Sequence, residues 1–347
     1  GDRGVIVAND TSNKRIAALR SNLQTWGALG VLITNAPGER FGRWFPETFD
    51  KVLLDAPCSG DTLRITTGRR SREVSDSERA NLCQRQGALL VSALQAVRPG
   101  GEIVYSTCTM APEEDEAILD ELLRTYPDAA QIDVLDHLPV TAPGLALAAY
   151  DLQVKRAIRL WPHLYHTSGF FAARIRKLRS IAGDISPDAP PARPWVQTGL
   201  RPISRQNQAQ ITDSVQQAFG FDLAAQQVTL WQRDKSVHAI PERIVSQFGD
   251  LPNVGAGFLV GQMGGDQFIP SHELITRYEA QFGGGRLALD ADQLAIWLQG
   301  RDLRSVPAMP YAAGSVILLV DERGRFVGRG KVQRDRVRNL LPRRLTQ

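Results

Sequence analysis

The 347-residue chain has only three cysteines and no long hydrophobic run. Three cysteines are too few for a disulfide scaffold or a cysteine-rich zinc site, which indicates reduced thiols and a cytoplasmic location. No apolar run approaches the roughly 18 residues that cross a bilayer. The first residues also lack the basic and apolar regions of a signal peptide. We therefore expect a cytoplasmic protein that does not interact with membranes.

The composition is that of a folded protein. Hydrophobic residues make up 43% of the chain and charged residues 22%, which is near the globular average and argues against global disorder. At roughly 100–200 residues per domain, the length allows two or three domains, each able to bury a core.

The positive charge is concentrated near the C-terminus. Between Arg323 and Arg344 there are nine basic residues and one acid, a net charge of +8 in a chain whose total is +4, so the rest of the chain carries −4. Such a patch attracts polyanions through phosphate contacts and counterion release. A solvated basic tail is the alternative, but alternation with Gly, Val and Phe indicates a folded sheet. The candidate RNA-binding residues are Arg329, Lys331, Arg334, Arg336, Arg338, Arg343 and Arg344.

Strand-like and helix-like segments alternate over the first half of the chain. This order is typical of an α/β protein with a parallel sheet and right-handed crossovers. The segment 4–10 (GVIVAND) already resembles a buried strand, so we expect the chain to begin inside its own sheet, without the first strand. The predicted strands are 4–10, 31–34, 51–56, 102–107 and 168–176, and the predicted helices are 12–27, 76–97 and 112–126.

Three polar features follow strands of this predicted sheet. They are Asp10, the loop around Cys58 and the loop around Cys108. Ligands bind at the carboxyl ends of strands in such sheets, so we expect the three to share one edge. Asp10 suits either the ribose hydroxyls of a nucleotide or a helix N-cap. The two thiols suit either reactive cysteines in polar loops or buried structural residues.

The two cysteine loops carry recognisable motifs. Residues 55–60 (DAPCSG), 105–109 (YSTCT) and the acidic helix that follows resemble the Sun (Nol/Nop/Sun) family of RNA cytosine-5 methyltransferases. The segments 159–163 (RLWPH) and 169–171 (GFF) are similar to a later motif of that family. The segment 326–345 is similar to the C-terminal PUA-like RNA-binding domain of its bacterial 16S rRNA branch.

The resemblance implies a cofactor, a substrate and a role for each motif residue. It implies transfer of a methyl group from S-adenosylmethionine to C5 of a cytosine in rRNA. Cys108 would add to C6 of the base, and Cys58 would assist breakdown of the covalent adduct. Asp55 would hold the N3/N4 edge of the cytosine. The cofactor-binding residues implied are Asp10, Asp55 and Asn35.

The sequence departs from the family pattern in its cofactor motifs. The glycine-rich loop that follows the first strand in the family is absent from the chain. Pro37 stands where the family has an acid facing the adenine, and proline offers neither a carboxylate nor an N–H donor. The alternative function is therefore a catalytically inactive RNA-binding homologue that lacks a complete cofactor site.

The proline content suggests the domain organisation. Residues 179–202 are rich in Pro, which is typical of an extended linker. The five histidines have no metal-ligand spacing, so no metal is expected. The expected partner is 16S rRNA, free or in the small ribosomal subunit, and the expected state is a monomer. The predicted domains are a methyltransferase domain with a Rossmann-like sheet (1–178), a linker (179–202), a small α+β domain (203–285) and a PUA-like RNA-binding domain (286–347).

Overall fold

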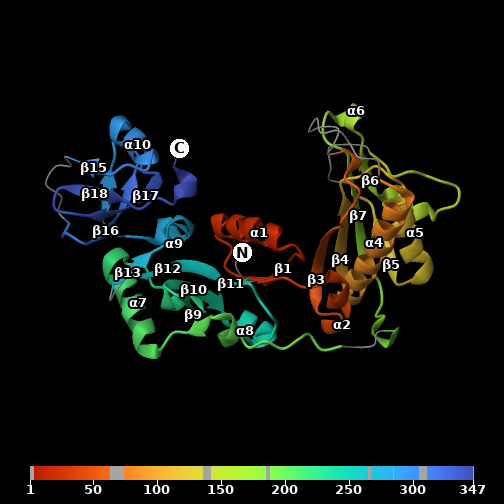
Figure 1. Cartoon of the computed structure of the whole chain (residues 1–347), viewed down its shortest axis with the longest axis horizontal. Coiled ribbons are helices and arrows are strands. Elements are labelled where there is room, and N and C mark those ends of the chain that lie inside the picture. The colour runs from red at the N-terminus through yellow and green to blue at the C-terminus, as the bar shows by residue number, and fades with distance from the viewer. Residues whose placement is uncertain are drawn as a thin grey trace. The chain divides into compact units, whose positions relative to one another are not determined.

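The protein is described from a computed structural model (Figure 1). It describes residues 4–62, 74–135, 142–184, 188–264, 267–283, 285–304 and 311–346. The chain divides into two compact units. We call Pro37–Pro190 the central unit, and we call Gly1–Ala36 together with Pro191–Gln347 the composite unit. Each is described by itself.

The central unit is built on one mixed sheet. Its strand order is β3-β4-β7-β5, with β6 added against β7. β3 and β4 run parallel, whereas β7 is antiparallel to β4, β5 and β6. The strands are β3 (Phe49–Asp55), β4 (Val97–Thr107), β5 (Ala130–Asp133), β6 (Ile158–Leu160) and β7 (Phe170–Lys177).

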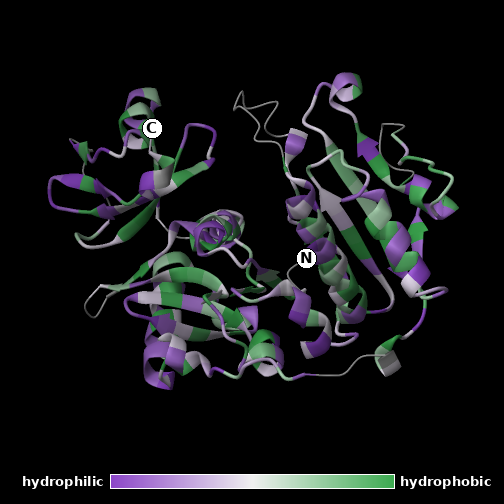
Figure 2. Ribbon diagram, turned by 45° about the vertical axis from the view of Figure 1, so that its right-hand side comes forward, coloured by the Kyte–Doolittle hydropathy of each residue, from purple (hydrophilic) through white to green (hydrophobic). Residues whose placement is uncertain are grey.

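Two long helices cover one face of this sheet (Figure 1). α4 (Asp76–Ala96) begins at a capping box formed by Ser75 and Glu78, and α5 (Glu116–Thr125) follows the Cys108 loop. Their apolar residues pack on Ile103, Tyr105 and other inward residues of the strands, which are mostly hydrophobic in Figure 2. The shorter helices are η1 (Gly38–Arg40), α2 (Phe41–Trp44), η2 (Leu152–Arg156), α6 (Pro162–Tyr165) and η3 (Ala182–Asp184).

The composite unit starts with a parallel βαβ segment. β1 (Ile6–Asn9) and β2 (Val31–Thr34) are joined by α1 (Asn13–Thr25), whose N-cap is Ser12. β2 also pairs with the short strand β11 (Gly255–Ala256). The sequence predicts that β1 and β2 share a sheet with β3 and β4, but in the structure they form a separate sheet with β11. The free edge of β2 is hydrogen-bonded by β11 and its flanking residues, so it does not pair with a strand of the central unit.

Two further five-stranded sheets complete the composite unit. Their orders are β13-β12-β10-β9-β8 and β14-β16-β17-β18-β15. The first sheet consists of β8 (Arg201–Pro202), β9 (Val228–Arg233), β10 (Ser236–Pro241), β12 (Phe258–Gly264) and β13 (Gln267–Pro270). The second consists of β14 (Arg286–Ala288), β15 (Leu303–Arg304), β16 (Val316–Val320), β17 (Phe326–Val332) and β18 (Arg336–Asn339).

Helices pack on both sheets. α7 follows its N-cap Ser204, and α10 follows Asp290, which forms a capping box with Gln293. Trp297 of α10 is fully buried in the core of the second sheet. The helices are α7 (Arg205–Phe219), α8 (Glu242–Phe248), α9 (His272–Tyr278) and α10 (Ala291–Leu298), with the turns η4 (Trp195–Thr198), η5 (Ala224–Gln226), η6 (Glu279–Gln281) and η7 (Arg343–Leu345).

The proline-rich segment is more structured than a plain extended linker. It contains the turns η3 and η4 and buries Ile181 and Trp195, each 2% exposed. Two apolar side chains explain the difference. Ile181 packs in the core of the central unit, and the Trp195 ring contacts the Trp231 ring of β9. Among the described residues, no helix is both long and apolar enough to span a bilayer.

Candidate active site

Cys58 and Cys108 meet at the carboxyl ends of two neighbouring strands. Cys58 follows β3 and Cys108 follows β4, and these strands pair in parallel with Asp55 opposite Ser106. The two sulfur atoms lie 2.9 Å apart, and the backbone N–H of Cys108 donates to the Cys58 sulfur at 3.3 Å. Both thiols are free and half-buried. The parallel pairing of the strands therefore places two thiols in direct contact.

The contact gives the two thiols opposite electrostatic properties. A hydrogen bond from the Cys58 thiol lowers the pKa of Cys108, although partial burial and the charge of Asp55 act against this. The same hydrogen bond, together with burial, raises the pKa of Cys58. The pair therefore favours a thiolate on Cys108 and a neutral thiol on Cys58. A thiolate is the nucleophilic form of cysteine.

The surroundings leave room beside the sulfur atoms. Asp55 ends β3 with an exposed side chain. Gly60 has a φ of +67°, in the left-handed region that suits glycine, and a Cβ added there would lie 4.0 Å from the Cys108 sulfur. On the other side, the Thr62 hydroxyl donates to the carbonyls of Cys108 and Gly169, at 2.8 and 3.1 Å. These contacts join the segment before β7 to both cysteine loops.

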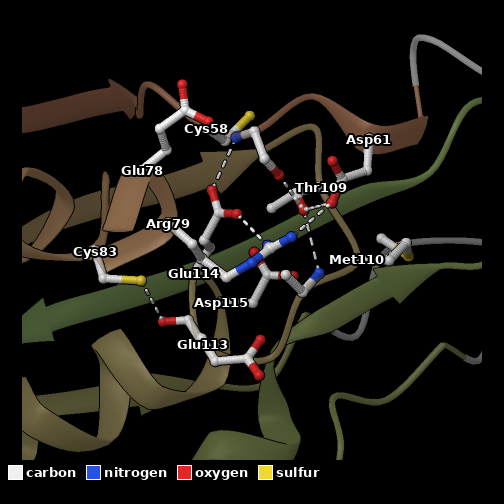
Figure 3. Close-up of polar contacts among 12 residues, drawn as sticks. Cys58, Asp61, Glu78, Arg79, Cys83, Thr109, Met110, Glu113, Glu114 and Asp115 are labelled. Atoms are coloured by element: carbon white, nitrogen blue, oxygen red, sulfur yellow. Dashed lines mark hydrogen bonds and ion pairs between the residues drawn. The ribbon is translucent and has the colours of Figure 1, made fainter. Parts of the chain in front are cut away.

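A buried carboxylate connects the two cysteine loops (Figure 3). Glu114 is fully buried and accepts the backbone N–H of Ser59 at 2.9 Å. Its carboxylate also binds Arg79 at 2.6 Å and the Gln86 amide at 3.0 Å. Arg79 in turn lies 3.4 Å from Asp61. The network joins α4, the Cys58 loop and the segment after Cys108.

A second buried charge cluster lies behind the Cys108 loop. The Arg159 guanidinium is fully buried, contacts Glu116 through both carboxylate oxygens, and reaches Asp115 at 3.1 Å. It also lies 5.0 Å from the centre of the Trp161 ring. Burial raises the pKa of Asp115 to about 8, although its hydrogen bond with Thr107 and the charge of Arg159 act against this. Glu116 is therefore the main counter-ion of Arg159.

Asp10 and Asn35 lie together in the composite unit. They follow the parallel strands β1 and β2, and the Asn35 amide donates to the Asp10 carbonyl at 2.6 Å. The Asp10 carboxylate accepts the Ser12 N–H at 2.7 Å and pairs with Arg15 at 2.8 Å. Since Ser12 is the N-cap of α1, Asp10 is not the cap itself. Pro37 begins the turn η1 without a side-chain hydrogen bond.

The described C-terminal basic residues lie on three neighbouring segments of the chain. They are Arg329 and Lys331 of β17, Arg334, Arg336 and Arg338 before and on β18, and Arg343 of η7. β16 and β17 pair antiparallel around a turn in which Asp321 accepts the N–H groups of Arg323 and Arg325. Arg334, Arg338 and Arg343 are exposed, whereas Lys331 and Arg336 are half-buried. The side chain of Arg344 lies outside the described residues.

Arg329 differs from the other candidate RNA-binding residues. Its guanidinium donates to the Leu340 carbonyl at 2.8 Å, and burial lowers its pKa to about 10. This contact ties the half-buried Arg329 to the segment after β18, so its guanidinium is less open to solvent than those of the exposed arginines, and its role in RNA binding stays a prediction.

Sequence reasoning missed the buried acids and their partners. The sequence marks Glu114 only as one of four successive acids at the start of a predicted helix, and nothing in that run indicates which of the four is buried. Arg79 carries no signal either, since an arginine in the first turn of a helix is common on surfaces.

Comparison with known proteins agrees with these motifs. The family described as 16S rRNA methyltransferase RsmB/F matches residues 1–176. The ribosomal RNA small subunit methyltransferase F of Erwinia tasmaniensis is 31% identical over 348 residues, covering all of this chain and 69% of the relative. That of Vibrio parahaemolyticus serotype O3:K6 is 29% identical and is covered to 70%.

A solved structure gives a weaker likeness. A methyltransferase homolog protein from Pyrococcus horikoshii is 33% identical, with a TM-score of 0.43. The match covers 51% of this chain and 54% of that one. The family assignment therefore rests on the sequence comparisons.

The fold and the paired thiols define a mixed α/β methyltransferase with a β-rich C-terminal region. The chain belongs to the RsmB/F family of 16S rRNA methyltransferases, which use S-adenosylmethionine to make 5-methylcytosine.

Proposed function

We propose that this chain methylates C5 of a cytosine in small-subunit rRNA through a covalent adduct between Cys108 and C6. The observation that carries the proposal is the 2.9 Å contact between the sulfur atoms of Cys58 and Cys108. C5 of cytosine is a poor nucleophile, and addition of a thiolate at C6 makes it electron-rich. The contact favours a thiolate on Cys108, as that step requires.

The residues take part in the reaction in a defined order. The Cys108 thiolate forms a bond to C6 of the base. Asp55, which is exposed at the end of β3, holds the N3/N4 edge of the base during this step. C5 would then take the methyl group, whose bond to the sulfonium sulfur of the donor breaks and leaves its electron pair on that sulfur. Once Cys108 is bonded to C6, Cys58 no longer faces a thiolate and can release its own proton to solvent. Finally, the Cys58 thiolate takes the proton of C5 from its position against the Cys108 sulfur, the bond between C6 and that sulfur breaks, and the electron pair of the bond returns to Cys108.

The polar side chains at the ends of β1 and β2 fit S-adenosylmethionine, the methyl donor. The Asn35 amide donates to the backbone carbonyl of Asp10, which brings the two strand ends that carry this amide and the Asp10 carboxylate together. Such groups bind ribose hydroxyls and the polar edge of adenine. Asp10 and Asn35 would hold S-adenosylmethionine, and Asp55 completes the predicted cofactor-binding set. When bound, the cofactor supplies an electrophilic methyl group on a sulfonium.

The C-terminal basic residues would bind the rRNA. Lys331 and Arg338 are opposite each other on β17 and β18, so two cationic side chains lie on the same face of the second sheet. RNA phosphates are suitable anionic partners for them. This supports a PUA-like RNA-binding role for residues 286–347, with the exposed residues Arg334, Arg338 and Arg343 among the contacts. We place the monomeric enzyme in the cytoplasm, with 16S rRNA or the small subunit.

The domain boundaries are part of the proposal. We propose that residues 1–178 form one methyltransferase domain with a Rossmann-like sheet, followed by a linker to residue 202 and a small domain to residue 285. The family match over residues 1–176 supports the first boundary. The parallel segments β1-α1-β2 and β3-α4-β4 are each of the kind that builds Rossmann-like sheets, although β2 pairs with β11 and not with the strands of the central unit.

A methylation assay tests the function directly. The protein is incubated with labelled S-adenosylmethionine and small-subunit RNA, and 5-methylcytosine is mapped by bisulfite sequencing. We expect one modified cytosine with the wild-type protein and none with Cys108→Ala. Tight RNA binding without methyl transfer would overturn the proposal and support the inactive homologue.

A further inference from the structure

Glu114 contacts the Cys58 loop from the segment that carries Cys108. It lies six residues after Cys108 in the chain, yet its carboxylate accepts the N–H of Ser59, the residue after Cys58, at 2.9 Å. Its own backbone carbonyl accepts the Tyr105 hydroxyl at 2.7 Å. Glu114 is thus fixed to β4 at its backbone and to the opposite loop at its side chain.

The carboxylate of Glu114 is fully buried and fully partnered. Arg79 of α4 neutralises its charge at 2.6 Å, and Figure 3 shows the Arg79 side chain reaching between Glu114 and Asp61. A buried carboxylate is costly unless it is paired and hydrogen-bonded, so these partners fix one orientation of the side chain.

Other groups hold the same loop in place. The Gln86 amide donates both to the Pro57 carbonyl at 2.8 Å and to Glu114 at 3.0 Å. The hydroxyls of Ser59 and Thr109 lie 3.0 Å apart and form a direct hydrogen bond between the two loops. The contacts of Glu114 and Gln86 therefore flank Cys58 on both sides in the sequence.

We propose that Glu114 is a positioning residue, which holds the Cys58 loop against the Cys108 loop so that the Cys58 thiol hydrogen-bonds the Cys108 sulfur. The effect of this role on catalysis rests on the proposed function, whereas the geometry of the two loops does not. Glu114 touches neither sulfur and acts through Cys58.

The test compares Glu114→Gln with Glu113→Gln in the full chain. Glu113 is the neighbouring residue with an exposed side chain, so it provides a control of the same chemistry. In Glu114→Gln the new NH₂ group faces the donors of Arg79 or Gln86, and the loop loses its anchor. The first readout is the pH profile of Cys108 alkylation by iodoacetamide, followed by peptide mass spectrometry without RNA or cofactor.

We expect Glu114→Gln to slow Cys108 alkylation at neutral pH about tenfold, as a thiol pKa higher by one would do. We also expect kcat to fall at least as much, while KM for S-adenosylmethionine stays within about twofold. Glu113→Gln should match the wild type. If Glu114→Gln has the same alkylation profile as Glu113→Gln, the positioning role is wrong.

A second variant covers the case in which Glu114→Gln does not fold. Gln86→Leu removes the amide that bridges Pro57 and Glu114 but leaves the Arg79 ion pair intact, and it should slow Cys108 alkylation in the same direction. An unchanged profile in a folded Gln86→Leu protein would also overturn the proposal. If the wild type transfers no methyl group while the alkylation results hold, the proposed function fails and the positioning role stands.

Discussion

The sulfur atoms of Cys58 and Cys108 lie 2.9 Å apart, although the two residues are 50 positions apart in the chain. Parallel pairing of β3 and β4 produces this contact, since it brings the carboxyl ends of the two strands to one edge of the sheet. The hydrogen bond between them distinguishes the nucleophile from its partner. Several consequences can be measured.

The first prediction concerns the covalent adduct. Cys58→Ala should accumulate a protein–RNA adduct that survives denaturing electrophoresis, because Cys108 can attack C6 but is released slowly. Cys108→Ala should form none, and the double variant should also form none. The reverse pattern for the single variants would exchange the two roles.

The second prediction concerns pH. Because the pKa of Cys108 is lowered and burial raises that of Cys83, Cys108 should react with iodoacetamide at lower pH than Cys83. Raising the pH deprotonates Cys108 first, so the methyl-transfer rate should rise and level off before Cys83 becomes reactive. Cys58→Ala removes the thiol donor and should move the Cys108 profile to higher pH. Mass spectrometry of the alkylated peptides measures each profile.

The third prediction concerns the buried cation behind the Cys108 loop. Arg159→Met should lower the free energy of unfolding by about 3–5 kcal/mol, because it leaves the buried Glu116 carboxylate without its main counter-ion. Chemical denaturation measures the loss. Arg98→Met is the control, since the Arg98–Asp50 pair is exposed and should contribute less than about 1 kcal/mol. Equal losses in the two variants would contradict the burial argument.

The fourth prediction concerns the methyl donor. Asp10→Asn should weaken S-adenosylmethionine binding by at least about tenfold, as loss of a hydrogen bond to a charged group does. Arg15→Gln leaves the carboxylate in place and removes only its exposed ion pair, so it should bind the donor as well as the wild type does. Calorimetry measures both, and unchanged binding in Asp10→Asn would remove Asp10 from the cofactor site.

The fifth prediction concerns RNA. Replacing the exposed residues Arg334, Arg338 and Arg343 with Gln should weaken rRNA binding and lower the slope of log affinity against log salt by about 2, if each contacts one phosphate. The control carries the same loss of charge in the central unit. It replaces Arg40, Arg85 and Arg98, each already paired with an acid, and should keep the wild-type slope. Equal slopes in the two triple variants would argue against a specific role for the C-terminal basic residues.

Much of the local structure was predictable because single residues decide it. The helix predicted over 12–27 follows its N-cap Ser12, and the helix predicted over 76–97 begins at Asp76, so both predictions are confirmed. The folded sheet expected around the C-terminal basic residues is confirmed as well, since β16, β17 and β18 pair there. The cysteine loops were found because their motifs are specific.

The rest depends on contacts that short patterns do not encode. β11 is two residues long and has no strand signature, so its pairing with β2 could not be read from the sequence. Four acids follow one another at 113–116, and only the folded turn decides that Glu113 is exposed while the next three are buried. Arg329 was grouped with its basic neighbours, although its guanidinium packs inward.

The exposed basic residues Arg334, Arg338 and Arg343 have a consequence for the stability of the free protein. RNA that contacts them binds the folded C-terminal sheet and not the unfolded chain, so RNA binding and folding of this region are thermodynamically linked. The C-terminal sheet should therefore melt at a higher temperature in the presence of its RNA substrate than alone.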